Sequence, residues 1–314
     1  MPQVSVVIPV YKVEPYIERC LHTLFGQTLE EIEYIFVDDG SPDASVAKIG
    51  EVLERYPHRK SQTKLLRHDR NRGVAAARTT GIRAATGEYL IHCDPDDYVE
   101  PDMYEKLYAK AKETDADLVV CNHWLNERIV RYDYADTPQA CLKNLYKKGA
   151  YSIHLVTKLI RRAVLAAHNI VPYEGIDFGE DLNCTVRMFY YARKLAVVDL
   201  PLYHYCQREH SLSTSAELVD DFDKRTQLVQ TICGFFEQRG EHQYDTFCNY
   251  LKFSVKFRFR ELFPDSRQWF DWYRECHRDV LKFDESSRKI RIVLWLVLQN
   301  YWIYKWTKPF IPGW

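Results

Sequence analysis

The 314-residue sequence lacks several features that mark other classes of protein. Its nine cysteines show no CxxC or CxxH spacing, which argues against a zinc site or a disulfide framework and favours a reducing compartment. No uninterrupted apolar run is long enough to cross a bilayer, and the amino terminus carries no signal-peptide pattern. We therefore expect a cytoplasmic protein.

The chain also has almost no net charge. Its formal net charge is −1, so nothing in the composition predicts a nucleic-acid partner. The charge is unevenly spread, because residues 251–314 hold 13 Lys and Arg against 7 Asp and Glu. An apolar fraction of 46% is typical of a globular protein, and the length allows more than one domain.

The first 120 residues alternate between short apolar runs and stretches with helical spacing. The apolar runs predict strands at residues 4–10, 32–37, 65–66, 89–93 and 118–121. Helices are predicted to begin near Pro15, Pro42, Gly73 and Pro101. Strands that alternate with helices predict an α/β fold with a mostly parallel, doubly wound sheet.

The regular alternation stops after residue 123. The following elements are predicted there: a hairpin or loop at 124–134, helices at 138–148, 163–168 and 183–192, and short strands at 158–160, 196–199 and 202–205. From residue 216 onward the pattern is helical. We therefore predict a catalytic domain of residues 1–215 and a helical region of residues 216–314 that serves packing, dimerisation or membrane association.

Three carboxylates follow the fourth predicted strand in Asp94-Pro95-Asp96-Asp97. Ligands bind at the carboxyl edge of an open α/β sheet, and acids crowded there repel each other unless a cation joins them. Pro95 restricts the backbone between Asp94 and Asp96. An acidic turn is the alternative. The pattern favours Mg²⁺ or Mn²⁺, held by Asp94 and Asp96 and bridging phosphates.

Two further acidic turns leave alternatives open. In Asp38-Asp39-Gly40-Ser41, either Ser41 or Asp43 caps the next helix, or a carboxylate accepts from a base or a ribose. Glu180 and Asp181 begin a helix, where acids meet the macrodipole, or Asp181 acts as a general base. Arg78, Lys158 and Arg208 are candidates for neutralising a departing diphosphate, and His92, His204 and His210 are expected in the core rather than on a metal.

Five segments occur in a recognisable order: residues 4–11, 37–41, 71–78, 94–97 and 179–182. Together they resemble family 2 inverting glycosyltransferases of the GT-A fold, particularly those that build bacterial capsule, exopolysaccharide or lipopolysaccharide. The resemblance covers about residues 2–213. The sequence departs from the usual pattern at His92-Cys93 and His210, which bears on donor-sugar selectivity.

The resemblance implies a UDP-sugar donor and a role for each matching residue. Those that would contact the donor are Pro9, Tyr11, Glu14, Asp39, Arg78, Asp94, Lys158, Arg208 and Ser211. Among these, Asp39 would contact the uracil edge, and Asp94 the ribose or donor sugar. Asp96, with Asp94, would bind Mn²⁺ or Mg²⁺. Asp181 would be the catalytic base, with Glu180 beside it in the catalytic set.

The expected reaction is a single in-line displacement with inversion at the anomeric carbon. The acceptor would be a hydroxyl of a glycan or a lipid-linked saccharide. Two alternatives remain, a non-catalytic subunit that binds sugar nucleotides and a phosphatase that uses Asp94 as nucleophile. Nucleotide-dependent redox chemistry is disfavoured because the first strand lacks a GxGxxG turn.

An aromatic-rich helix is predicted at residues 290–306, flanked by basic side chains. One interpretation packs it on the catalytic domain or at a homodimer seam. The other lays it on the inner face of the cytoplasmic membrane, where apolar and basic side chains favour an interfacial helix.

Overall fold

A computed structural model describes residues 1–147, 151–173, 175–207, 218–262, 267–283 and 288–307. The chain divides into two compact units, and each is treated by itself. The first comprises Met1–Gln139 and Ser152–Thr214, and the second comprises Ala140–Tyr151 and Ser215–Trp314. The sequence prediction divided the chain once, near residue 215, and did not include the short excursion of residues 140–151.

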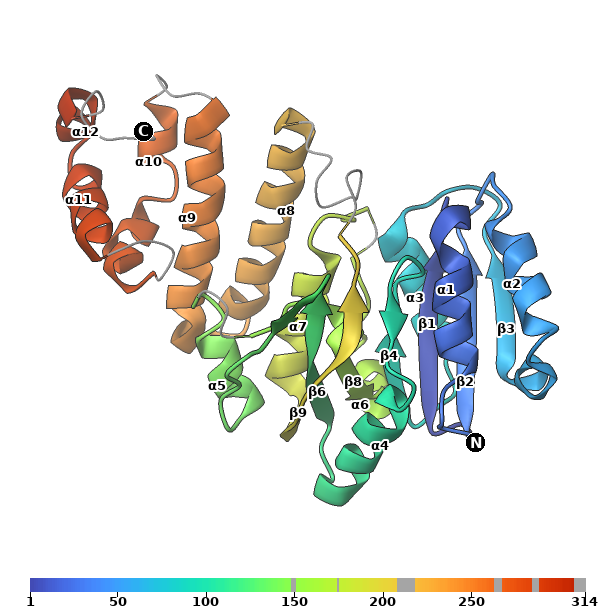
Figure 1. The fold of residues 1–314 in the computed structure, drawn as a ribbon. Coiled ribbons are helices and arrows are strands. Elements are labelled where there is room, and N and C mark those ends of the chain that lie inside the picture. Colours follow the sequence, from blue (N-terminus) through green and yellow to red (C-terminus); the bar gives the residue numbers. More distant parts are fainter. Residues whose placement is uncertain (148–150, 174, 208–217, 263–266, 284–287, 308–314) are drawn as a thin grey trace. The chain divides into compact units, whose positions relative to one another are not determined.

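A sheet crosses the first unit (Figure 1), and the described residues give it nine strands in the order β3-β2-β1-β4-β8-β6-β9-β5, with β7 paired to β6. The strands are β1 (Val4–Val10), β2 (Ile32–Asp38), β3 (Thr63–Arg67), β4 (Tyr89–His92), β5 (Tyr98–Val99), β6 (Leu118–Leu125), β7 (Arg128–Val130), β8 (Lys158–Arg161) and β9 (Leu195–Tyr205). Val7 pairs with Ile35 on one side and with His92 on the other. Strands β2, β1 and β4 therefore end at the same edge of the sheet.

Most strands run in one direction, which confirms the predicted α/β class. Strands β1, β2, β3, β4, β6 and β9 are parallel, whereas β5, β7 and β8 run the opposite way. The predicted strands 196–199 and 202–205 are one strand, β9, whose pairing with β6 shifts register around Asn122. The predicted break between the two strands was wrong, because a bulge interrupts the pairing with β6 without ending the strand. Strand β5 was not predicted.

Helices cover both faces of this sheet (Figure 1). They are α1 (Glu14–Phe25), α2 (Ser45–Leu53), α3 (Val74–Ala84), α4 (Met103–Thr114), α6 (Arg162–Ala167) and α7 (Glu180–Tyr191), with 3₁₀ turns at Pro57–Gln62 and Leu155–Thr157; α5 (Pro138–Lys143) lies at the division of the units. Small residues let α3 approach β1 closely. A Cβ on Gly81 would lie 2.3 Å from Cγ1 of Val7.

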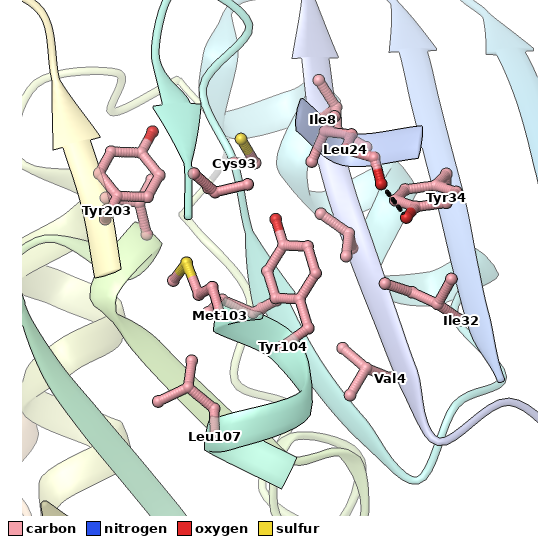
Figure 2. Close-up of a cluster of buried hydrophobic side chains, with 14 of the residues drawn as sticks. Val4, Ile8, Leu24, Ile32, Tyr34, Cys93, Met103, Tyr104, Leu107 and Tyr203 are labelled. Atoms are coloured by element: carbon pink, nitrogen blue, oxygen red, sulfur yellow. Dashed lines mark hydrogen bonds between the residues drawn. The ribbon is translucent and has the colours of Figure 1, made fainter. Parts of the chain in front are cut away.

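The main core lies beneath α1 and α4 (Figure 2). Tyr104 and Leu107 of α4 and Leu24 of α1 are fully buried against the strands. The hydroxyl of Tyr34 donates to the carbonyl of Leu24 and ties β2 to α1. Burial raises the pKa of Tyr34, so this hydroxyl stays neutral.

The second unit is helical in the part of it that the structure describes. Its helices are α8 (Leu218–Glu237), α9 (Asp245–Leu262), α10 (Gln268–Asp271), α11 (Arg288–Leu298) and α12 (Tyr301–Thr307), with 3₁₀ turns at His242–Tyr244 and Arg274–Lys282. Trp269, Phe283 and Leu298 belong to its buried core, which is rich in aromatic side chains. None of the described helices has the length and apolarity that crossing a membrane requires.

Candidate active site

Arg78 of α3 joins three carboxylates from two distant segments, the turn after β4 and the start of α7. Its Nη1 donates to Oε1 of Glu180 at 2.6 Å and to Oδ1 of Asp181, and its Nη2 donates to Oδ1 of Asp94 at 2.8 Å. The Arg78 side chain is only 3% exposed. A buried guanidinium presents rigid, forked donors, so it fixes the positions of all three carboxylates.

The two acids at the start of α7 have pKa values displaced in opposite directions. Burial and repulsion from Asp181 raise the pKa of Glu180, and the attraction of Arg78 does not offset them. Burial alone would raise the pKa of Asp181, but the positive charge of Arg78 lowers it. The amide of Leu155 also donates to Oδ2 of Asp181 at 3.3 Å. Asp181 is therefore the acid that keeps its negative charge.

His92 lies behind this cluster at the end of β4. It is 1% exposed, and neither ring nitrogen has a hydrogen-bond partner among the described residues. Burial and the nearby charge of Arg78 lower the pKa of His92 to about 3, so the ring is neutral. The expectation of core histidines holds for His92. His204 is half-buried, with Nε2 2.7 Å from Glu100, and His210 lies outside the described residues.

Asp39 organises the loop that precedes α3. Its Oδ1 accepts the amide of Arg72 at 2.9 Å and lies 2.6 Å from Nδ1 of His68, while its Oδ2 accepts the amide of Gly73 at 2.8 Å. The capping alternative applies to Asp43, whose Oδ1 accepts from Ser45. Asp39 is only 3% exposed.

Asp177 was missed by the sequence analysis. Its Oδ1 accepts the amide of Ala75 at 3.0 Å, which joins the segment before α7 to the first turn of α3. Gly73 permits this contact, because its φ is +91° and a Cβ there would lie 2.3 Å from the Asp177 carboxylate. The sequence around Asp177 contains no motif that indicates a role, because its partner Ala75 lies 102 residues away.

The acids after β4 separate into two environments. Asp94 and Asp96 are half-buried, and the Asp94 side chain keeps 27% of its surface exposed. Asp97 is buried and accepts from the Tyr203 hydroxyl at 2.6 Å and from the amide of Cys206 at 2.7 Å. Burial and the charge of Asp94 raise the pKa of Asp97 to about 7. Asp97 therefore supports the turn.

The donor set fits a nucleotide-bound divalent cation. In the described part of the chain no cluster of three or more His, Cys, Asp or Glu side chains is arranged to hold a metal by itself. Mg²⁺ on a nucleotide usually takes one or two protein carboxylates and completes its shell with phosphates and waters. Asp94 and Asp96 supply carboxylates of this kind, and Asp94 pairs with the cationic Arg78.

Four of the other predicted donor-binding residues lie near the carboxyl end of β1 or at the start of β8. Pro9 is inside β1, and Tyr11 follows it, with its pKa lowered chiefly by a hydrogen bond with Asn71. Glu14 accepts the amide of Ala44 at 3.0 Å and so joins α1 to the loop before α2. Lys158 is buried, and its Nζ donates to the carbonyl of His154 at 2.7 Å. Arg208 and Ser211 lie outside the described residues.

Known proteins share both the sequence pattern and the fold. The profile described as "Glycosyl transferase family 2" matches residues 5–163. EpsH of Bacillus subtilis strain 168 is 36% identical over 252 residues, which cover 76% of this chain and 71% of EpsH. The chain belongs to glycosyl transferase family 2. It is a glycosyltransferase, as the order of its motifs predicted.

Two solved structures resemble this family 2 glycosyltransferase in fold. TarS residues 1–349 of S. aureus, crystallised with UDP-GlcNAc, superposes with a TM-score of 0.69 at 20% identity, over 97% of this chain and 89% of that one. The mannosyltransferase PcManGT of Pyrobaculum calidifontis, in complex with GDP-Man and Mn²⁺, has a TM-score of 0.56 at 15% identity, over 98% and 83%. The similarity to TarS confirms the predicted GT-A fold.

Proposed function

We propose that this glycosyltransferase moves a sugar from a UDP-sugar to a hydroxyl of a glycan or lipid-linked saccharide in the synthesis of a bacterial surface polysaccharide. The observation that carries the proposal is the Arg78 cluster, which gathers Asp94, Glu180 and Asp181 around one buried cation. Asp94 lies at the sheet edge, where it can contact the donor. Asp181 keeps its negative charge and can accept a proton from the acceptor.

UDP is the favoured nucleotide because TarS, which shares the fold, was crystallised with UDP-GlcNAc. We place the nucleotide at the ends of β1 and β2, between Tyr11 and the loop that Asp39 organises. Pro9 and Glu14 border the same end of β1, and Lys158, Arg208 and Ser211 complete the proposed donor-contacting set. The hydrogen bonds of Asp39 to the amides of Arg72 and Gly73 give it a second role, which is to hold the loop backbone where the base would bind.

A Mn²⁺ or Mg²⁺ ion held by Asp96 and Asp94 would neutralise the charge that develops on the departing diphosphate. Arg78 would add positive charge on the same side, since Asp94 links it to the metal-binding turn. The complex of PcManGT with GDP-Man and Mn²⁺ supports this proposal, because that enzyme has the same fold.

Asp181 is the proposed general base. It would take the proton of the acceptor hydroxyl while the hydroxyl oxygen forms a bond to the anomeric carbon and the bond from that carbon to the UDP oxygen breaks. Attack opposite the leaving group inverts the anomeric centre. Glu180, whose pKa is raised, would hold Arg78 in place rather than accept this proton.

We further propose that the second unit attaches the enzyme to the inner face of the cytoplasmic membrane. Apolar side chains of α11 and α12 are well exposed: Ile292, Val293, Leu296, Trp302 and Ile303. Arg291 and Lys305 lie on the same two helices. Apolar side chains interleaved with cationic ones suit a surface of anionic lipids, where a lipid-linked acceptor would reside.

The proposal is tested by measuring nucleotide release from a panel of UDP-sugars and GDP-mannose, with Mn²⁺ and with EDTA. We expect Mn²⁺-dependent release of UDP from at least one UDP-sugar. Release only from GDP-mannose would overturn the UDP assignment. Hydrolysis of a phosphomonoester instead would support the phosphatase, and binding of UDP without any release would support the non-catalytic subunit.

A further inference from the structure

A row of aromatic side chains begins beside Asp181. Nδ1 of His154 lies 3.9 Å from Oδ2 of Asp181. The His154 ring is stacked against Tyr205, with centroids 5.8 Å apart and planes at 26°, and meets His123 edge-on at 5.7 Å. The proposed base therefore has aromatic rings as its immediate neighbours.

The row continues away from Asp181 through two tyrosines. Tyr132 is stacked on His123 with centroids 5.6 Å apart, and Tyr134 lies 5.9 Å from Tyr132. His123 is 5% exposed and forms the inner part of the row. His154, Tyr205, Tyr132 and Tyr134 are each half-buried, so part of each ring faces solvent.

The sheet brings these residues together from four separate segments. Strands β6 and β9 lie side by side (Figure 1), and Leu125 pairs with Tyr205. Strand β8 pairs with β6, with Val120 opposite Lys158. This pairing brings His154, which lies just before β8, to the sheet edge where β6 and β9 end. The row thus lies on the β6 and β9 side of β4, whereas Asp39 follows β2 on the other side.

The chemistry of the row suits a sugar ring. A pyranose has faces of C–H groups that pack on aromatic rings, and a rim of hydroxyls that hydrogen-bond to tyrosine and histidine. A lipid chain would instead need a wide, continuous apolar surface, and the row carries a polar group on every ring. The position of the row also favours the acceptor sugar, because the donor nucleotide is proposed to bind on the opposite side of the Arg78 cluster.

We propose that His154, Tyr205 and Tyr132 form the binding subsite for a pyranose ring of the acceptor, and that this subsite directs one acceptor hydroxyl to Asp181. The acceptor is then recognised through its sugar, whether or not that sugar is attached to a lipid. The orientation toward Asp181 rests on the proposed function, but the binding of a saccharide to the row does not.

The test uses the full chain and methyl β-glycosides of glucose, galactose and N-acetylglucosamine as probes, with binding followed by saturation-transfer NMR in the presence of UDP and Mn²⁺. The variants are Tyr205→Leu, Tyr132→Leu and Tyr205→Phe. The matched control is Tyr191→Leu, because Tyr191 is stacked on His168 at 3.8 Å and lies at the other end of α7 from Asp181.

We expect at least one glycoside to bind the wild type and Tyr191→Leu alike. Tyr205→Phe should keep most of this affinity, because it keeps the ring and loses only the hydroxyl. Tyr205→Leu and Tyr132→Leu should raise its dissociation constant tenfold or more and leave the affinity for UDP unchanged. The inference is overturned if no glycoside binds the wild type, if the two leucine variants bind like the wild type, or if Tyr191→Leu loses binding equally. Glycoside binding with the expected pattern but without sugar transfer would count against the proposed function and not against this subsite.

Discussion

At the scale of single residues, Arg78 holds the acidic side chains of the candidate active site together. It is 3% exposed and pairs with three carboxylates, so its removal would leave Asp94, Glu180 and Asp181 facing each other in a partly buried site. Breaking a buried ion pair costs about 3–5 kcal/mol. We therefore expect Arg78→Met to lower the unfolding free energy by about that amount, measured by urea denaturation at neutral pH.

The control for this prediction lies on the same helix. Arg83 is exposed on α3, and Arg83→Met should change the unfolding free energy by less than about 0.5 kcal/mol, which is usual for surface substitutions. Equal stability of Arg78→Met and Arg83→Met would show that the cluster contributes little to folding.

Gly73 gives a second test at this scale. Its φ of +91° and the 2.3 Å approach of a Cβ to Asp177 both oppose a side chain. Gly73→Ala should shift the loop that Asp39 holds, destabilise the chain by about 1–3 kcal/mol, and weaken UDP binding in calorimetric titration. Gly50→Ala is the control, because nothing lies within 4 Å of its Cβ position on α2. Unchanged UDP affinity in Gly73→Ala would refute the link between this loop and the nucleotide.

Sequence patterns found much of the candidate site, but not its internal contacts. The positions of Asp94 after a strand and Asp181 at the start of a helix marked them as candidates. In the structure both accept hydrogen bonds from Arg78. Their roles stay predictions. Asp177 and His154 were missed, because their importance comes only from segments that meet in three dimensions. No local pattern encodes such a meeting.

At the scale of elements, the positions of most strands and their mostly parallel direction were predictable, but the antiparallel exceptions were not. Residues 158–160 were predicted as a short strand, but their antiparallel pairing with both β4 and β6 was not predicted. Strand β8 runs the opposite way because the segment before it returns to the edge of the sheet at which β4 and β6 end. Likewise, β9 continues through Pro201 because a bulge absorbs the irregular pairing. Two-residue β5 is too short to give a periodic signal.

The contact between α9 and the 3₁₀ turn at Arg274–Lys282 predicts a pH dependence. Nζ of the buried Lys256 lies 2.6 Å from Nε2 of His277. Burial and this ammonium lower the pKa of His277 to about 4, against about 6.5 in an unfolded chain. Between these values the unfolded state binds more protons, so stability should fall as pH decreases from about 6.5 to 4.

The variant His277→Gln removes this titration and keeps an oxygen that can accept from Lys256. From pH 7 to pH 4.5 the wild type should lose up to about 3 kcal/mol more unfolding free energy than the variant. Urea denaturation followed by tryptophan fluorescence measures this difference. Parallel pH profiles for the two proteins would mean that His277 is not held neutral.

At the scale of the whole molecule, membrane attachment can be tested on the full chain. Vesicles of phosphatidylcholine with phosphatidylglycerol should co-sediment the protein, and pure phosphatidylcholine vesicles should do so less. Leu296→Glu places a charge on α11 where the side chain is 50% exposed, and should reduce binding tenfold or more. Leu281→Glu, at 43% exposure off the two helices, is the control. Equal binding by Leu296→Glu and the wild type would remove the proposal.

Asp181 is the proposed base of an inverting sugar transfer. The most direct measurement compares Asp181→Asn with Glu180→Gln, since both side chains accept from Nη1 of Arg78. For each variant, UDP and Mn²⁺ binding is measured by calorimetry, and transfer by UDP release with acceptor. Asp181→Asn should bind UDP like the wild type and lose about 10²–10⁴-fold in transfer, while Glu180→Gln loses much less. Undiminished transfer by Asp181→Asn would show that Asp181 is not the catalytic base.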